Sequence, residues 1–265
     1  MSMFRRVPAA LLVALCAVPA WPQFHPEEIT AAQKDPKKYT IDESTIKITK
    51  VGPAVSPDAI KSPPADGGGI GGALPVLDQI INTAQKIWKI IADNHPVVDV
   101  KAPPYATALP KGLTGWTDLG GWHPPVGTIY ELTAKNAYGM KMINLRYQVL
   151  RTYGGSYQGK GKYLTAVTVE PLLVEVGWGY HFSLEASIPD TSIVNVGTSQ
   201  DPVAGMMATL NWHISTPIKD SQGQGLYYLQ GDGAFREVGG PFSNQSLEKT
   251  KAKVAALNEN TPGFE

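Results

Sequence analysis

The chain has 265 residues, with 23 basic and 23 acidic side chains, no net charge and a single cysteine. This balance gives no long-range attraction to phosphate backbones, so we do not expect nucleic-acid binding. The length is sufficient for one substantial hydrophobic core.

The first 20 residues have the order of a secretory signal peptide. Arg5 and Arg6 precede an apolar run, residues 7–18, that is too short to span a bilayer. Val18-Pro19-Ala20 then supplies the small residues of a cleavage site. We therefore expect residues 1–20 to be removed and the mature protein to be periplasmic or extracellular.

Cleavage would also remove the only cysteine, Cys16. Leu15 precedes it where a lipoprotein signal has a small residue, so we do not expect a lipid anchor. The mature chain would carry 21 basic and 23 acidic residues, a net charge of −2. Without cysteine, its stability must come from burial and not from disulfides.

Residues 21–73 are rich in Lys, Asp, Pro and Gly and poor in aromatic residues. Proline and glycine resist packing into regular elements, so this composition predicts a flexible arm. Within the arm, polar and apolar side chains alternate along residues 45–51, which predicts one strand.

Residues 74–95 show the clearest helical pattern, an apolar stripe with a period of about 3.6 residues that ends before Pro96. Four large side chains of this stripe are the candidate contacts for a membrane or a partner: Ile80, Ile87, Trp88 and Ile91. Three roles are open for the predicted amphipathic helix. It packs on the neighbouring domain, it joins copies of the chain into a homo-oligomer, or the segment Gly67–Asn94 inserts into lipid.

Residues 96–127 form a predicted connector that contains several prolines and tryptophans. Trp116 and Trp122, together with Tyr157 further along the chain, are candidate ligand-binding residues because exposed aromatic rings can stack on sugars. The alternative is that the tryptophans anchor an irregular segment to the core.

Residues 128–240 have strand patterning throughout, with β-branched and aromatic residues and turn signals at short intervals. About seven or eight strands without intervening helices predict an antiparallel β-sandwich-like domain. Residues 241–265 predict a short helix and a C-terminal tail. The expected fold is therefore mainly β: a sandwich-like domain preceded by one amphipathic helix and a Pro/Gly-rich arm.

Two motifs suggest ligands but have simpler interpretations. Residues 154–161 nearly match a phosphate-binding loop, yet Gly161 replaces the residue that would hold magnesium, and a strand follows where a helix should begin. A β-hairpin with glycines at positive φ accounts for the same residues. Asp201 and Asp232 are candidate calcium ligands, but both lie beside typical turn residues.

Three histidines raise the question of zinc. His181 and His213 lie in predicted strands, and if those strands pair, His123 from the connector is a third candidate ligand. Their spacing forms no local chelate, so histidines on the outer face of a sandwich are the alternative. We predict no metal site and no cofactor.

Enzyme signatures are absent from the sequence, which has no nucleophile elbow and no zinc-protease motif. Glu175 and Glu185 lie on one face of a predicted strand, residues 172–188, but ten residues of strand separate them by roughly 33 Å. Only a turn near residues 177–179 would bring them together. We assign no catalytic residue.

The sequence therefore favours an exported, non-catalytic binding or structural module whose partner is a protein or a glycan. The alternative is a membrane-active or pore-forming protein that uses the segment Gly67–Asn94. An exported hydrolase with an unrecognised site is the third possibility.

Overall fold

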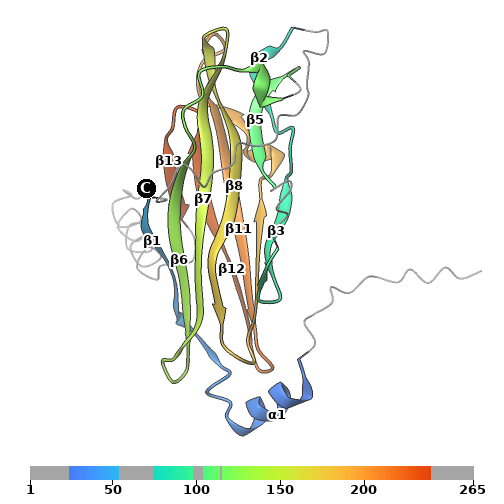
Figure 1. Ribbon diagram of the computed structural model, residues 1–265, viewed down its shortest axis with the longest axis vertical. Helices are drawn as coiled ribbons and strands as arrows, with labels where there is room; N and C mark the ends of the chain where they lie inside the picture. Colours follow the sequence, from blue (N-terminus) through green and yellow to red (C-terminus); the bar gives the residue numbers. More distant parts are fainter. Residues whose placement is uncertain (1–23, 54–73, 98–103, 114, 240–265) are drawn as a thin grey trace, which may run out of the picture.

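A computed structural model describes residues 24–53, 74–97, 104–113 and 115–239. It confirms a mainly β, sandwich-like fold: two antiparallel sheets pack face to face, and one α-helix precedes them in the chain (Figure 1). The predicted signal peptide, residues 1–20, and the predicted C-terminal helix and tail, residues 241–265, lie outside the described residues.

The first sheet has six strands in the order β1-β6-β7-β8-β5-β2. In chain order these strands are β1 (Ile41–Pro53), β2 (Val76–Ile81), β5 (Ala106–Lys111), β6 (Val126–Asn136), β7 (Lys141–Tyr157) and β8 (Lys160–Val176). The predicted strand at residues 45–51 is part of β1, which pairs with β6 at one edge of the sheet.

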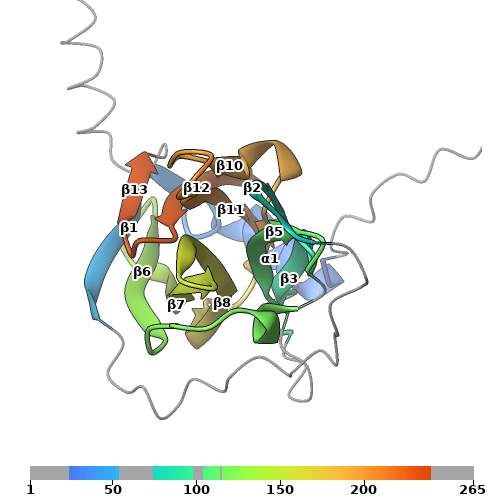
Figure 2. The same ribbon diagram turned by 90° about the horizontal axis from the view of Figure 1, so that it is seen from above.

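The second sheet has the order β13-β12-β11-β9-β3-β4, with β10 paired to the first two residues of β11 (Figure 2). Its strands are β3 (Ile87–Ala92), β4 (His95–Pro96), β9 (His181–Ser187), β10 (Val194–Asn195), β11 (Ala204–Ser215), β12 (Asp220–Gln230) and β13 (Phe235–Gly239). The part of the chain that the structure describes also contains two short 3-10 helices, η2 (Trp116–Asp118) and η3 (Asp190–Ser192).

The core lies between the sheets and follows the two-residue period of the strands. Along β7, for example, Ile143, Leu145, Tyr147 and Val149 alternate into the core. The hydroxyl groups of Tyr147 and Tyr227 are 2.7 Å apart, and their hydrogen bond joins β7 of one sheet to β12 of the other. Buried hydroxyl groups need such partners, so this bond also fixes how the sheets align.

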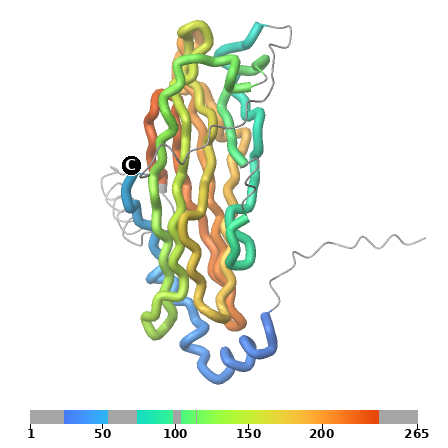
Figure 3. Tube along the Cα trace, viewed as in Figure 1, coloured from blue at the N-terminus to red at the C-terminus, as the bar shows by residue number. Residues whose placement is uncertain are grey.

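The long hairpin β7–β8 forms one end of the molecule (Figure 3). Its turn residues, Gln158 and Gly159, both have positive φ, as in the tight turns that match the twist of antiparallel strands. The stretch that resembles a phosphate-binding loop is therefore a hairpin, and a strand follows it where nucleotide binding would need a helix.

Near this end the two sheets are also joined through their backbones. The amide of Lys162 donates to the carbonyl of Pro202, and the amide of Gly154 donates to the carbonyl of Gly231, each at 2.9 Å. A side chain at Gly231 would meet the Lys162 carbonyl oxygen at 2.0 Å, so only glycine permits this approach.

The helix α1 (Pro26–Lys34) and the turn after it cover the opposite end of the sandwich (Figure 1). Asn136 Nδ2 donates to the Lys38 carbonyl at 3.1 Å, and Tyr138 donates to Asp35 at 3.0 Å. These bonds attach the segment to the β6–β7 turn. Part of the predicted arm, residues 24–53, is thus helix and strand packed on the domain.

The helix predicted at residues 74–95 is wrong in position and type. This segment forms β2, β3 and β4, whereas the one α-helix of the described residues is α1. Isoleucine pairs favour strands because branched side chains fit a pleated surface. Asp93 and Asn94, both at positive φ, then form the tight turn between β3 and β4.

Two boundaries also differ from the sequence-based expectation. The connector predicted at residues 96–127 contains β5, whose residues 106–110 are all buried. The single strand expected at residues 172–188 is divided into β8 and β9 by a turn that includes Gly179 at positive φ. Since β8 and β9 belong to different sheets, this turn is where the chain crosses the sandwich.

Candidate functional site

The two candidate tryptophans do come together, but in a packed arrangement. The rings of Trp116 and Trp122 meet edge to face with centroids 6.5 Å apart, and Trp122 Nε1 donates to the Trp116 carbonyl at 3.2 Å. The Trp122 ring lies on Gly155, where a Cβ would come within 2.3 Å of it. The indoles therefore anchor the connector to β7, as the alternative interpretation proposed.

The other aromatic residues near this end are also engaged. Tyr157 is partly buried against the core, and the exposed ring of His123 stacks on Tyr153 at 4.6 Å. The three predicted ligand-binding residues thus lie near one end of β7, but their packing leaves no ring standing free as a stacking platform.

The four predicted contact residues divide between the core and the surface. Trp88 is 6% exposed and Ile91 is fully buried, and Ile80 packs partly against the core. Ile87 is 63% exposed. The alternation of β3 explains why Ile87 is exposed beside buried Trp88, and a register shift between Lys89 and Ile91 brings Ile91 into the core.

Ile87 belongs to a series of exposed apolar side chains that we call the apolar edge: Leu74, Val76, Ile81, Ile87 and Val97. They follow β2, the outermost strand of the first sheet, and β3–β4, the outer end of the second (Figure 1). Edge strands present unpaired backbone groups, and exposed apolar residues on them favour association.

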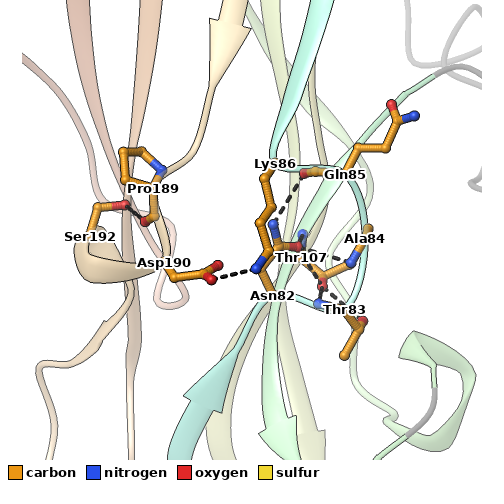
Figure 4. A network of polar contacts seen from close by, with 9 residues as sticks. All are labelled: Asn82, Thr83, Ala84, Gln85, Lys86, Thr107, Pro189, Asp190 and Ser192. Atoms are coloured by element: carbon orange, nitrogen blue, oxygen red, sulfur yellow. Dashed lines mark hydrogen bonds and ion pairs between the residues drawn. The ribbon is translucent and has the colours of Figure 1, made fainter. Parts of the chain in front are cut away.

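A hydrogen-bond network holds the chain where it passes between these strands (Figure 4). Asn82 Oδ1 accepts from the amides of Ala84 and Thr107 at 3.1 and 3.0 Å, and Asn82 Nδ2 donates to the Gln85 carbonyl at 3.1 Å. An ion pair between Lys86 and Asp190 follows. The network fixes the loop between Ile81 and Ile87, and so fixes the apolar edge.

The histidines do not form a metal centre. The strands β9 and β11 pair, with His181 opposite Ser215 and His213 opposite Ser183, so both imidazoles lie on one face of the sheet. His123, however, stacks on Tyr153 near the other end of the molecule. Among the described residues, no group of three or more His, Cys, Asp or Glu side chains is placed to hold a metal ion.

Each of the two sheet histidines has a carboxylate partner. His181 Nδ1 contacts Asp93, and its Nε2 lies 3.8 Å from Glu28 of α1, while Phe24 packs edge-on against the ring at 4.7 Å. His213 Nε2 lies 3.4 Å from Asp220. His181 therefore helps to attach α1 to the end of the sandwich.

The candidate carboxylates are separated or serve turns. Glu175 and Glu185 lie on β8 and β9, hence on the outer faces of different sheets. Asp201 Oδ1 accepts from the Gly161 amide at 3.0 Å, and Asp232 Oδ1 accepts from the Ala234 amide at 3.0 Å. Asp232 thus stabilises its own turn, as the turn-forming interpretation expected, whereas Asp201 attaches its loop to the β7–β8 hairpin.

A cluster that the sequence did not predict lies between β6–β7 and β12–β13; we call it the tyrosine–arginine seam. It consists of Tyr130, Tyr147, Arg151, Tyr227 and Phe235. Tyr130 stacks on Tyr147 at 5.7 Å and lies 4.9 Å from Tyr227, whose ring is parallel to that of Phe235 at 6.0 Å. The seam thus links the two sheets through aromatic contacts.

Arg151 ends this series inside the sandwich. It is 8% exposed, and its guanidinium lies 4.2 Å from the centre of the Phe235 ring. Burial lowers the pKa of Arg151, whereas the nearby phenols of Tyr153 and Tyr130 raise it. Arginine nevertheless stays protonated in proteins, so the seam holds a buried positive charge.

One sequence signal could have identified this residue. Arg151 continues the core-facing positions Tyr147 and Val149 on β7, where a charged residue interrupts an apolar series. Its contact with Phe235 could not be found in this way, because nothing in the sequence pairs β7 with β13.

No family model, curated protein or solved structure matches this chain. Among the described residues, no helix is long and apolar enough to cross a membrane.

Proposed function

We propose that this protein is an exported, non-catalytic binding module that docks a partner protein along its apolar edge. The observation that carries the proposal is the exposure of five large apolar side chains on or directly beside the outer strands of both sheets: Leu74, Val76, Ile81, Ile87 and Val97. Exposed apolar side chains along edge strands favour the addition of a strand or burial by a partner.

The order of the loop at this edge supports the proposal. The side chain of Asn82 holds the loop through four hydrogen bonds, to Ala84, Gln85 and Thr107, and Lys86 is paired with Asp190. A surface that is already ordered loses little conformational entropy when a partner docks, which favours affinity. A protein partner fits better than a glycan, since Trp116 and Trp122, the candidate residues for sugar stacking, are packed on β7.

The test compares two exposed residues on opposite sides of the sandwich: Ile87 on β3 of the second sheet and Val51 on β1, an edge strand of the first sheet. A photo-cross-linking residue replaces either Ile87 or Val51, which is 54% exposed on β1. In the native host we expect an adduct of one defined mass from position 87 and none from position 51. The cross-linked partner, once purified, should bind Ile87→Asp at least about tenfold more weakly than Val51→Asp, a loss of about 1.4 kcal/mol.

Equal binding by the two variants would contradict the apolar edge as the docking surface. Sequencing of the mature N-terminus tests export separately, with residue 21 expected as the first residue. If the exported protein yields no adduct at position 87, the proposed function is wrong even though the signal peptide is correct.

Membrane activity is the second candidate, because the apolar edge overlaps the segment Gly67–Asn94. Its observable is dye release from lipid vesicles. Release by the unaltered protein that Ile87→Asp abolishes, while Val51→Asp preserves it, would replace the docking proposal with a membrane-active function.

A further inference from the structure

Arg151 is a buried cation whose hydrogen-bonding groups are not used. Its Nε and Nη1 atoms are fully buried and have no hydrogen-bond partner, and no carboxylate of the described residues lies within ion-pair distance of the guanidinium. Burying an unpaired charge is costly, so proteins normally pair such groups or use them to hold a ligand.

The aromatic neighbours of Arg151 satisfy only part of this charge. The Phe235 ring, 4.2 Å from the guanidinium carbon, offers its π face. The in-plane N–H groups need acceptors that a ring does not provide. The Tyr147 and Tyr227 hydroxyls bond to each other at 2.7 Å, and burial keeps Tyr130 neutral by raising its pKa, so no phenolate supplies the missing charge.

The guanidinium is not completely closed off. Nη2 has no hydrogen-bond partner among the described residues and, unlike Nε and Nη1, is not fully buried. Arg151 pairs with Val126 at the start of β6, and its guanidinium lies over Phe235 of β13, the edge strand of the second sheet (Figure 2).

We propose that Arg151 is the centre of a binding site for a small oxyanion, a carboxylate, sulfate or phosphate group, at the tyrosine–arginine seam. An oxygen of such a group can accept a charge-assisted hydrogen bond from Nη2, the guanidinium nitrogen that is not fully buried. The site is separate from the apolar edge and does not depend on the proposed docking function.

Glu237 provides an internal check on this proposal. It is opposite Tyr227 in the β12–β13 pair and therefore faces the seam, yet it is exposed and makes no ion pair with Arg151. If Arg151 serves an external anion, the Glu237 carboxylate repels that anion. If Glu237 were instead the natural partner of Arg151, its carboxylate would stabilise the guanidinium, and removing that carboxylate would weaken anion binding.

The experiment measures melting temperature and calorimetric binding of the full chain with sodium phosphate, sulfate or acetate, against chloride at matched ionic strength. We expect a saturable increase in melting temperature for at least one oxyanion, since a ligand that binds only the folded state stabilises it. Arg151→Met keeps an unbranched side chain without charge and should weaken binding at least about tenfold. Arg151→Lys should have an intermediate affinity, because it retains the positive charge but not the planar guanidinium.

Arg236→Met is the matched control, because it removes an exposed positive charge from the neighbouring strand β13. It should bind as the unaltered protein does, and Glu237→Gln should bind severalfold more tightly. The proposal is overturned by the absence of any saturable shift, by unchanged affinity in Arg151→Met, or by equal losses in Arg151→Met and Arg236→Met. Weaker binding by Glu237→Gln would also overturn it, since Glu237 would then belong to the arrangement that holds Arg151.

Discussion

Two regions of this sandwich differ in which side chains they bury: one exposes apolar groups, and the other buries polar groups and a charge. On one side, the apolar edge along β2–β4 leaves large aliphatic side chains in solvent. On the other, the tyrosine–arginine seam beside β13 encloses phenols and a guanidinium. Neither arrangement is what stability alone selects, because stability favours apolar groups inside and charges outside. Local departures of this kind are where functional sites are expected.

The two sides also differ in how the chain is fixed. The apolar edge relies on side-chain hydrogen bonds to the backbone, centred on Asn82. The seam relies on side-chain contacts across the core, of which the bond between Tyr147 and Tyr227 is the shortest. Changes at the seam should therefore act on global stability, and changes at the edge should act locally.

High pH should destabilise the whole fold, with three of the five tyrosines concerned lying in the seam, and gives the largest expected effect. Burial raises the pKa of five tyrosines above their usual value of 10.0: Tyr130, Tyr147, Tyr163, Tyr180 and Tyr227. Their folded pKa values exceed the unfolded one, so the stabilisation is complete below pH 10 and is lost as pH rises, because only the unfolded chain ionises. Each contributes about 1.4 kcal/mol per pH unit, and five together about 7 kcal/mol.

Urea unfolding at several pH values between about 9 and 11 measures this slope. Tyr147→Phe removes one ionisable group and should reduce the slope by about one fifth. A free energy of unfolding that does not depend on pH above 10 would show that these phenols ionise equally in the folded and unfolded chains.

Trp88→Ala tests the boundary between the edge and the core within a single strand. Trp88 is buried and its neighbour Ile87 is exposed. Loss of the indole should cost about 3 kcal/mol through lost burial and a residual cavity, and the melting temperature should fall by several degrees. Ile87→Ala should change the free energy of unfolding by no more than about 0.5 kcal/mol. Similar losses at the two positions would contradict the alternation of β3.

Strand periodicity explains how much of this fold could be predicted from the sequence. From β6 to β13 the two-residue alternation and the glycine turns predict about the observed number of strands, because each strand has one face on the core, although the strand predicted at residues 172–188 is divided between β8 and β9. The segment 74–95 was misassigned since Ile80-Ile81 and Ile90-Ile91 satisfy helical and strand spacing equally well. Tertiary contacts select the strand conformation here, because β2 pairs with β5 and β3 pairs with β9.

The binding surfaces were harder to predict for the same reason. The candidate tryptophans lie side by side in the structure, and their burial depends on Gly155, which admits the Trp122 ring against β7. The seam depends on β13 lying over β7, which brings Phe235 to Arg151. Sequence spacing contains no information about such contacts between sheets.

Arg151→Met sharpens the comparison from the seam side and should raise stability. In a chloride buffer without oxyanions, replacing an unpaired buried charge with an apolar side chain of similar length should increase the free energy of unfolding by about 1–4 kcal/mol. Arg236→Met, on the exposed surface of β13, should stay within about 0.5 kcal/mol of the unaltered protein. A destabilised Arg151→Met variant would mean that the cation–π contact with Phe235 outweighs the cost of burying the charge.

Asn82→Ala tests the edge side and should have the smallest global effect. It removes the acceptor of the Ala84 and Thr107 amides, and a net loss of about 1–2 kcal/mol is expected for these bonds together. Because the loop lies at the rim, the loss should appear as faster hydrogen exchange at Ala84 and Thr107, with the core strands unchanged. Asn195→Ala is the matched control, since Asn195 Oδ1 accepts from the Gly197 and Val203 amides in the same manner.

The two variants should loosen their own loops and leave each other's exchange rates unchanged. If the apolar edge is a docking surface, only Asn82→Ala should also weaken partner binding, because only that loop positions Ile81 and Ile87. Equal weakening by Asn195→Ala would show that binding follows overall stability. Full affinity in Asn82→Ala, with the loop demonstrably loosened, would show that the side chains of the edge suffice without the ordered backbone between them.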